Sequence, residues 1–266
     1  MNNFRNNKWN NKPQATKEKP HGVARVISKR GFCSRSQAEN LVREGRVSLR
    51  GKIVRDPDTP AYENDKILVD GKAVTANAFV YFMMNKPRGY VTTANDEKGR
   101  ATVMDLFRER FCKMIPGKPV PHISPVGRLD AASEGLLLFT NDTKWADVVL
   151  SGANHTKIYR VQVAGHPTTE DLHKMEEGFN VPPRVFGEKE EFMHAVRAVF
   201  HRESDKTSWL EITLDEGKNR EIRRMLAHLG YEVLRLVRIK FCNYELGDLK
   251  QGEIKEIRPN SEQTTV

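Results

Sequence analysis

The stretch from Val126 to Asp142 is the feature that most constrains how this chain can fold. Gly127, Arg128 and Asp130 lie in a turn, and a strongly apolar segment that suits a buried strand follows them. A carboxylate just before such a strand would be held at the rim of a packed core, where partial desolvation and a cationic partner often accompany function. For an isolated acid, a plain surface turn ahead of a core strand would be the preferred interpretation.

Composition sets broad limits. The 266 residues, 38% of them hydrophobic, suffice for one large domain or two smaller ones with a packed core. No apolar run of about 18 residues occurs, so no membrane span is expected. The first residues lack the apolar segment of a secretory signal, and Cys33, Cys112 and Cys242 are too widely spaced for a zinc ribbon or a disulfide framework. We therefore expect a cytoplasmic protein that uses no metal and no cofactor.

Positive charge is concentrated at one end of the chain. Residues 1–76 contain 16 Lys and Arg against 8 Asp and Glu, whereas the remainder contains 28 against 27. A basic module joined to a nearly neutral body favours a polyanionic partner, with nucleic acid preferred to a membrane surface. The alternative is a basic domain that is merely soluble.

Residues 22–75 have the pattern of a small module of two helices and short strands, preceded by a basic, disordered tail at residues 1–21. Ser34 and Gln37 form a capping-box pair, which predicts the start of the second helix. The dipeptide Asp70-Gly71 predicts a hairpin turn near the end of the module.

A second domain is expected from Phe79 to residue 258, followed by a short tail at residues 259–266. The apolar run Phe79–Met84 predicts a strand, and Tyr90–Thr93 is expected to return beside it. Residues 111–125, with four prolines, are expected to form an irregular loop. Strands and helices then follow without regular alternation, which predicts an α+β fold with a mostly antiparallel sheet. The expected helix caps are Thr102, Asp142 and either Thr168 or Thr169.

A helix expected over Asn219–Leu229 can supply the cation for the acid. Four apolar side chains share one face of this helix, and Arg220 and Arg224 fall roughly opposite, where they would be solvated or bind phosphate. Arg223 falls on the flank of the apolar stripe and would need an anionic partner. We expect a bidentate pair with Asp130 that keeps the carboxylate ionised, the alternative being that Arg223 reaches solvent.

Three segments of the basic module, Gly31–Arg35, Glu44–Val47 and Gly51, resemble the small RNA-binding domain named after a small-subunit ribosomal protein, the S-four-like domain. The resemblance implies that this small αα-β module binds RNA. For any single arginine, a solvated helix face is an equally good interpretation. The candidate contact residues are Arg30, Arg35, Arg43 and Arg46.

Four motifs follow one another in the second domain: Gly127–Asp130, Lys157–Tyr159, Gly217–Met225 and Leu236–Arg238. In this order they resemble the ribosomal RNA pseudouridine synthases of the RsuA type. The resemblance implies a mostly antiparallel mixed-sheet catalytic domain with a central cleft. It also implies an isomerase that flips a uridine out of folded RNA, releases its base and rejoins it through C5.

The same resemblance implies the roles of single residues. Asp130 would be the catalytic carboxylate, acting at the ribose C1′ side of the uridine. Tyr159 would stack on the flipped base and help remove the C5 proton, although an isolated tyrosine of this kind is more often a core residue. Arg223 would pair with Asp130, and Leu236 would support the base. Arg128 would meet an RNA phosphate or brace the turn.

Two other functions remain open from the sequence. The first is a non-catalytic assembly factor that binds ribosomal RNA, and the second is a carboxylate glycosidase, for which Glu134 is the nearby candidate for the second acid. The intact set of Asp130, Tyr159 and Arg223 favours the synthase. We expect a monomer that acts on ribosomal RNA or a subunit precursor, with large-subunit RNA preferred and small-subunit RNA open.

Overall fold

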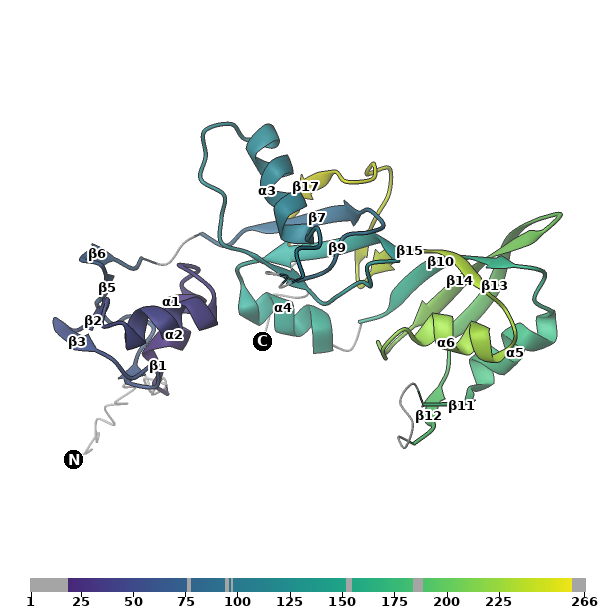
Figure 1. The fold of residues 1–266 in the computed structure, drawn as a ribbon, viewed down its shortest axis with the longest axis horizontal. Helices are drawn as coiled ribbons and strands as arrows, with labels where there is room; N and C mark the ends of the chain where they lie inside the picture. Colours follow the sequence, from purple (N-terminus) through teal and green to yellow (C-terminus); the bar gives the residue numbers. More distant parts are fainter. Residues whose placement is uncertain are drawn as a thin grey trace, which may run out of the picture. The chain divides into compact units, whose positions relative to one another are not determined.

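The computed structural model describes residues 19–75, 78–93, 96, 98–151, 155–183 and 189–259. The chain divides into two compact units, Met1–Asn77 and Ala78–Val266 (Figure 1). The expected basic tail up to residue 18, residues 76 and 77 between the units, and the last seven residues lie outside the described residues.

The amino-terminal unit packs two helices and two small sheets around its own core. Four strands pair antiparallel in the order β3-β2-β5-β6, and β1 pairs with β4. Helix α2 begins at the predicted capping box of Ser34 and Gln37, and the turn before β6 has positive φ at Asp70 and Gly71 (49° and 76°), as the predicted hairpin requires. Its elements are β1 His21–Gly22, α1 Val23–Lys29, α2 Arg35–Arg43, β2 Val47–Leu49, β3 Lys52–Val54, β4 Pro60–Ala61, β5 Ile67–Val69 and β6 Lys72–Ala73.

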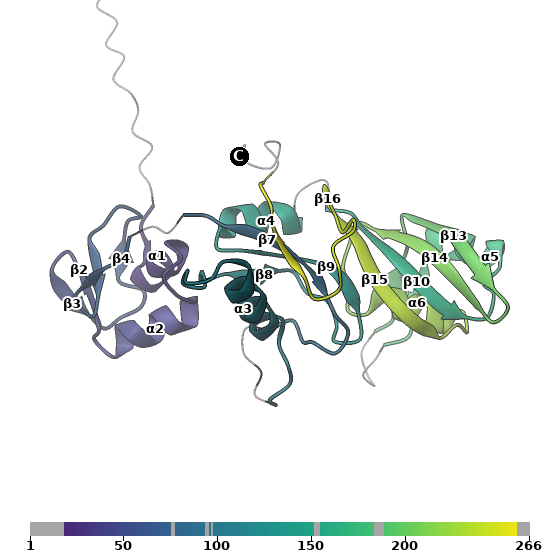
Figure 2. The same cartoon turned by 90° about the horizontal axis from the view of Figure 1, so that it is seen from above.

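The second unit is built on one nine-stranded sheet. Its strands follow the order β13-β14-β10-β15-β9-β7-β17, with β16 added to β15 and β8 to β9 (Figure 2). All neighbours are antiparallel except β15 and β9, which confirms the predicted α+β fold with a mostly antiparallel sheet. The strands are β7 Tyr81–Lys86, β8 Ser124–Val126, β9 Glu134–Thr140, β10 Lys157–Ala164, β13 Arg197–Ser204, β14 Thr207–Leu214, β15 Val233–Phe241, β16 Tyr244–Glu245 and β17 Ile254–Glu256.

Four helices cover this sheet, and a hairpin of β11 Phe179–Val181 with β12 Glu191–Met193 lies beside it. Helices α3 and α4 cover opposite faces of β7 and β9, whereas α5 and α6 share one face of the β10 half (Figure 1). Thr102, Asp142 and Thr168 accept hydrogen bonds from the first turns of α3, α4 and α5, as predicted. The helices are α3 Val103–Met114, α4 Thr143–Ser151, α5 Thr169–Glu177 and α6 Glu221–His228. Within the described part of the chain, none of the helices combines the length and the apolar character needed to cross a membrane.

Strand β10 separates two environments by its alternation. Tyr159, Val161 and Val163 point to the face that α5 and α6 cover, and the two valines are fully buried. Ile158 and Arg160 point to the opposite face. The same strand therefore supplies one core face and one face directed away from α6.

The two halves of the sheet meet at a short seam. Only Val237 with Glu134 and Arg238 with Gly135 are in parallel register between β15 and β9. Gly135 has a φ of +104°, and a Cβ built on it would lie 2.2 Å from the carbonyl oxygen of Arg238, so no side chain fits there. The chain completes β7, β8 and β9 in the first half, builds β10 to β16, and returns so that β17 pairs with β7.

Two expectations for this unit were wrong. Tyr90–Thr93 does not return as a strand beside β7, because β17 from the far end of the chain pairs there; Val91 forms a single bridge with Thr102 instead. The segment 111–125 is not all irregular, since α3 continues to Met114 and β8 begins at Ser124.

Candidate active site

A cavity of about 590 Å³ lies where the first turn of α6 meets the Tyr159 face of the sheet. Segments far apart in the sequence line it with Asp130, Tyr159, Arg220, Leu236 and Arg238. A larger hollow of about 800 Å³ lies on the opposite face, where Ile158 and Arg160 point. We assign the site to the smaller cavity because the predicted acid, tyrosine and leucine converge there.

The turn that carries Asp130 is fixed through its backbone. The Nζ of Lys86, which is fully buried, donates to the carbonyl oxygens of Asp130 at 3.0 Å, Ser133 at 2.7 Å and Pro87 at 3.1 Å. Burial lowers the pKa of Lys86 to about 8, while the acids nearby act in the opposite direction. On the other side, the Thr92 hydroxyl donates to the carbonyl oxygen of Leu129 at 2.7 Å. The main chain is thus held in place while the carboxylate stays partly exposed, at 37%.

The carboxylate of Asp130 pairs with Arg220, at 3.4 Å between Oδ2 and Nη1. Arg220 precedes α6 and has a φ of 52°, in the left-handed region. Its side chain therefore does not follow the helical spacing that placed it opposite the apolar face. The sequence named the right helix but the wrong arginine as the ion-pair partner.

Arg223, the predicted partner, holds the backbone around the acid instead. Its Nη2 donates to the carbonyl oxygen of Ala132 at 3.1 Å, and its Nη1 to that of Val233 at 3.0 Å. Burial lowers the pKa of Arg223, and the charge of Asp130 works in the opposite direction. Arg223 therefore joins α6, the Asp130 turn and the start of β15 without forming the expected bidentate pair.

Tyr159 is 8% exposed and lies beside the buried guanidinium of Arg238. Burial raises the pKa of the Tyr159 hydroxyl, whereas the charge of Arg238 and a hydrogen bond from it act in the opposite direction. Arg238 is fixed by a 2.8 Å hydrogen bond from its Nε to the carbonyl oxygen of Leu136 and lies over the ring of Phe241. The hydroxyl is thus neutral at physiological pH and has a fixed cationic neighbour.

The chain matches the family model described as RNA pseudouridylate synthase over residues 80–228, more than half of its length. It belongs to the RNA pseudouridylate synthase family. An S4 domain model matches residues 23–67 of the amino-terminal unit. Both resemblances seen in the sequence are thereby confirmed.

Individual members of this family are similar to the chain over nearly its whole length. The ribosomal large subunit pseudouridine synthase B of Bacillus subtilis is 35% identical, covering 90% of this chain and 92% of that one. An uncharacterized RNA pseudouridine synthase of Rickettsia prowazekii is 32% identical, with 88% and 93% covered. A crystal structure of a pseudouridylate synthase aligns with a TM-score of 0.58 at 26% identity, covering 90% of this chain and 96% of that one.

The glycosidase alternative required Glu134 beside Asp130. In the synthase, Glu134 is 6% exposed and its carboxylate forms two hydrogen bonds with Arg235, at 3.0 and 2.8 Å, and one with Gln251. It lines the hollow on the opposite face and not the cavity of Asp130. Glu134 is therefore bound as a structural anion and does not face the predicted catalytic acid.

The remaining predicted contacts of the second unit divide into two kinds. Arg128 is exposed and lines the cavity, as an RNA-contacting residue would. Arg224 was expected to be solvated or to bind phosphate, but its side chain is 13% exposed. It donates to Glu191 at 2.5 Å and to the carbonyl oxygen of Pro182 at 3.2 Å, so it fastens α6 to the neighbouring hairpin.

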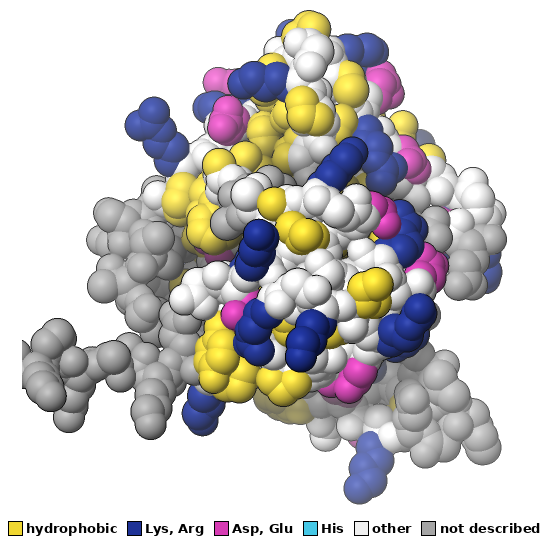
Figure 3. Space-filling model, turned by 90° about the vertical axis from the view of Figure 1, so that its left-hand side faces the viewer, with side chains coloured by type: hydrophobic (Ala, Val, Ile, Leu, Met, Phe, Trp, Pro, Cys, Tyr) yellow, Lys and Arg dark blue, Asp and Glu magenta, His cyan; other side chains and the backbone are white. Residues whose placement is uncertain are grey.

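In the S4 unit the candidate arginines are mostly exposed, and Figure 3 shows Lys and Arg side chains spaced over the face that it views. Arg46 pairs with Asp70 at 2.6 Å, and Arg35 and Arg43 each pair with Glu39. Arg30 differs, because its guanidinium donates to three backbone carbonyls, those of Glu63, Asp65 and Val74. Arg30 therefore braces its own unit, and RNA contact by these four residues stays a prediction.

Sequence reasoning missed Lys86, Arg238 and a pair of glutamates, Glu216 and Glu221. For Lys86 a signal existed, because Phe82, Met84 and Lys86 alternate onto the same buried face of β7. Arg238 lay in the motif Leu236–Arg238, but the motif did not predict its burial, because Arg238 is held by β9, which lies about a hundred residues earlier. Glu216 and Glu221 flank a turn, and no pattern in the sequence predicts that the turn brings their side chains together.

Proposed function

We propose that this chain converts a uridine of large-subunit ribosomal RNA into pseudouridine, with Asp130 as the catalytic carboxylate. The observation that carries the proposal is the convergence of Asp130, Tyr159 and Leu236 in one cavity, with Arg220 paired to the acid. The cavity volume lies in the range of about 300–1,000 Å³ that is typical of small-ligand sites.

The reaction is an isomerisation. The bond between N1 of uracil and C1′ of ribose breaks, a bond between C5 and C1′ forms, and the proton lost from C5 is matched by one gained at N1. Asp130 acts at the C1′ side, and its pairing with Arg220 orients the carboxylate. A uridine reaches this acid only after leaving its stack, and Tyr159 and Leu236 offer an aromatic and an aliphatic surface for the extruded base.

Tyr159 also helps to remove the C5 proton in this proposal. Arg238 supports that role, because its charge and its hydrogen bond favour the ionised hydroxyl and so oppose the effect of burial. Arg223 acts more remotely, by holding the backbone of the turn at Ala132. Arg128 at the mouth of the cavity meets an RNA phosphate.

The choice of RNA rests on two similarities. The Bacillus subtilis relative, named for the large ribosomal subunit, matches along 90% of the chain, and the basic amino-terminal unit matches the S4 domain. Neutralisation of phosphates by Lys and Arg of that unit would add affinity that depends on salt. We propose that the enzyme works as a monomer in the cytoplasm, on ribosomal RNA or on a precursor of the subunit.

The test is tritium release from C5-labelled uridine in large-subunit and small-subunit ribosomal RNA. We expect release from large-subunit RNA, loss of release in Asp130→Asn, and retention of RNA binding in that variant. Asp147→Asn, an exposed acid on α4, is the matched control and should behave as the wild type does. Release only from small-subunit RNA would show that small-subunit RNA, and not large-subunit RNA, is the substrate. No release from either RNA or from subunit precursors would favour a non-catalytic assembly factor.

Mapping of pseudouridines in ribosomal RNA from cells with and without the gene would then identify the uridine. One position should lose its modification in the absence of the gene. Complementation with Asp130→Asn should not restore it.

A further inference from the structure

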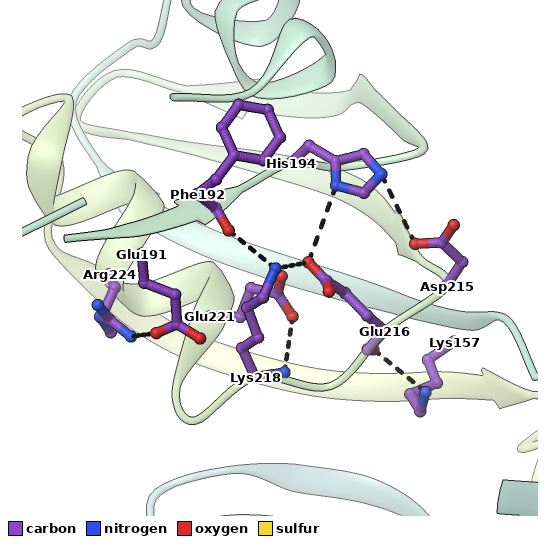
Figure 4. Close-up of polar contacts among 9 residues, drawn as sticks. All are labelled: Lys157, Glu191, Phe192, His194, Asp215, Glu216, Lys218, Glu221 and Arg224. Atoms are coloured by element: carbon purple, nitrogen blue, oxygen red, sulfur yellow. Dashed lines mark hydrogen bonds and ion pairs between the residues drawn. The ribbon is translucent and has the colours of Figure 1, made fainter. Parts of the chain in front are cut away.

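The first residue of α6, Glu221, is an acid buried beside the catalytic cavity, with 3% of its surface exposed. Its Oε2 accepts a hydrogen bond from the backbone N–H of Lys218 at 3.0 Å. Its Oε1 is fully buried, receives no hydrogen bond from any donor in the described ranges, and faces the carboxylate of Glu216 (Figure 4). Two facing carboxyl groups satisfy one another only if one of them carries a proton.

The surroundings decide which glutamate holds the proton. Glu216 has a cationic partner, since Lys218 Nζ donates to its Oε1, and His194 Nδ1 lies 3.8 Å from the same atom. Burial, together with the carboxylate of Glu216, raises the pKa of Glu221 well above its usual range. For Glu216, burial acts in the same upward direction, but the hydrogen bonds from Glu221 and Lys218 outweigh it and lower the pKa. The proton therefore lies on Glu221, whose O–H donates to an ionised Glu216.

We infer that Glu221 is a positioning residue, which as a neutral carboxylic acid clasps the loop Asp215–Arg220 and so sets Arg220 against Asp130. This inference rests on the proposed function. Glu221 holds the loop at two points, because it accepts a hydrogen bond from Lys218 and donates one to Glu216. Lys157 of β10 also holds the loop, because its Nζ donates to the carbonyl oxygen of Glu216 at 3.1 Å.

The clasp explains the backbone of Arg220. This residue lies between Lys218 and Glu221, which are joined by the 3.0 Å hydrogen bond, and it takes a φ of 52° within that closed turn. That conformation directs its guanidinium to Asp130 instead of along the helix face. Loss of the proton from Glu221 would place two negative charges in contact, open the loop and withdraw Arg220 from the acid.

Groups from several elements act on Glu216 and Glu221 and set the pH at which Glu221 loses its proton. Lys218 and Asp215 belong to the loop itself, Lys157 and Tyr159 to β10, and His194 to the segment after β12. Arg220 and Asp130 line the same cavity as Glu221. The charged and titratable neighbours are Asp130, Lys157, Tyr159, His194, Asp215, Lys218 and Arg220.

The decisive variant is Glu221→Gln, because an amide keeps the donor to Glu216 and the acceptor for Lys218 but cannot ionise. Glu221→Ala should lower kcat/KM by more than about tenfold at pH 7. Glu221→Gln should keep kcat/KM within about threefold of the wild type at the same pH. At alkaline pH the wild type should lose activity that Glu221→Gln keeps. Equal losses in the alanine and glutamine variants, or superimposable pH profiles of wild type and Glu221→Gln, would overturn the inference.

Two measurements without RNA separate this inference from the proposed reaction. Carbon-13 NMR of labelled glutamate carboxyl groups should show one resonance that titrates above neutral pH in the wild type and is missing from Glu221→Gln. Trypsin should cut after Lys218 or Arg220 faster in the wild type than in Glu221→Gln when both are compared at one alkaline pH. If both results are obtained but no RNA releases tritium, the positioning role of Glu221 is supported and the proposed reaction is refuted. If neither result is obtained, the positioning role is refuted whatever the activity.

Discussion

The ammonium nitrogen of Lys86 lies 3.0 Å from the carbonyl oxygen of Asp130, so the residue with the proposed catalytic carboxylate is held through its main chain by a buried cation. The same ammonium group donates to Ser133 at 2.7 Å, on the far side of the turn. A side chain from β7 thereby helps to fix the turn that places the acid, without touching the carboxylate.

Lys86→Met should lower both stability and turnover. Methionine fills a similar volume but leaves the carbonyl oxygens of Asp130 and Ser133 without their donor, at a cost of about 1–3 kcal/mol in the free energy of unfolding. Turnover should fall more than RNA affinity does, because the acid moves while the surface stays intact. Urea unfolding and tritium release measure the two effects. Lys113→Met, at an exposed lysine on α3, is the control and should change stability by less than about 0.5 kcal/mol.

The stability difference between wild type and Lys86→Met should also depend on pH. The pKa of Lys86 is lowered to about 8 in the folded protein from 10.5, so between these values the unfolded chain binds more protons. The wild type should therefore gain stability relative to the variant as pH rises through this window. A difference that is flat from pH 7 to 10 would show that Lys86 is not desolvated.

Arg220 and Arg223 should respond differently to substitution. The pair of Arg220 and Asp130 is more than a third exposed on both sides, so Arg220→Ala should leave the free energy of unfolding nearly unchanged while lowering kcat/KM by about tenfold or more. Arg223→Ala removes hydrogen bonds to two backbone carbonyls, and we expect it to cost about 1–3 kcal/mol of stability as well as activity. Thermal unfolding beside steady-state kinetics separates the two. Equal destabilisation by both substitutions would contradict these assignments.

Gly135→Ala should prevent stable folding of the second unit. The added Cβ would meet the carbonyl oxygen of Arg238 at 2.2 Å, and φ is +104°, so we expect a loss of more than about 3 kcal/mol. Gly165→Ala is the matched control, because Gly165 has a φ of +80° but, apart from its two chain neighbours, no atom of the described residues lies within 4 Å of the place that its Cβ would occupy. It should lose only about 1 kcal/mol, for backbone strain alone. Circular dichroism during denaturation would show whether the two substitutions differ as expected.

Removal of residues 1–77 should weaken RNA binding and flatten its dependence on salt. The deleted unit carries most of the net positive charge and has its own core, so the second unit keeps its packing. Filter binding at several salt concentrations would give the slope. Arg35→Ala combined with Arg43→Ala in the full chain should reduce the slope in part. Equal affinity and slope with and without the unit would refute its role in binding.

Local signals in the sequence were enough to locate most elements. The capping boxes at Ser34, Thr102 and Thr168 are made by residues three positions apart, so they do not depend on the rest of the fold. The predicted catalytic residues Asp130 and Tyr159, and the predicted base-supporting residue Leu236, belong to motifs that the family resemblance already ordered. These residues line one cavity because the sheet brings their motifs together.

What the sequence could not predict depends on distant contacts or on one backbone angle. Tyr90–Thr93 has strand-forming residues, but the edge beside β7 belongs to β17, about 160 residues later. Helical spacing placed Arg220 opposite the apolar face because it assumed a helix through that residue, whereas the left-handed φ of Arg220 removes it from the spiral. Arg224 is covered by Glu191 from a hairpin that no local pattern brings to α6.

The route of the chain through the sheet has a mechanical consequence. The strands from β10 to β16 form an insertion whose two ends are both anchored in the other half, before β10 and at β17, and whose edge touches that half at the Gly135 seam. A rotation that widened the gap between Asp130 and Tyr159 would have to break the pairing of β15 with β9. We therefore expect the cavity to keep its shape, so that the uridine and the RNA around it supply most of the adjustment when the two meet.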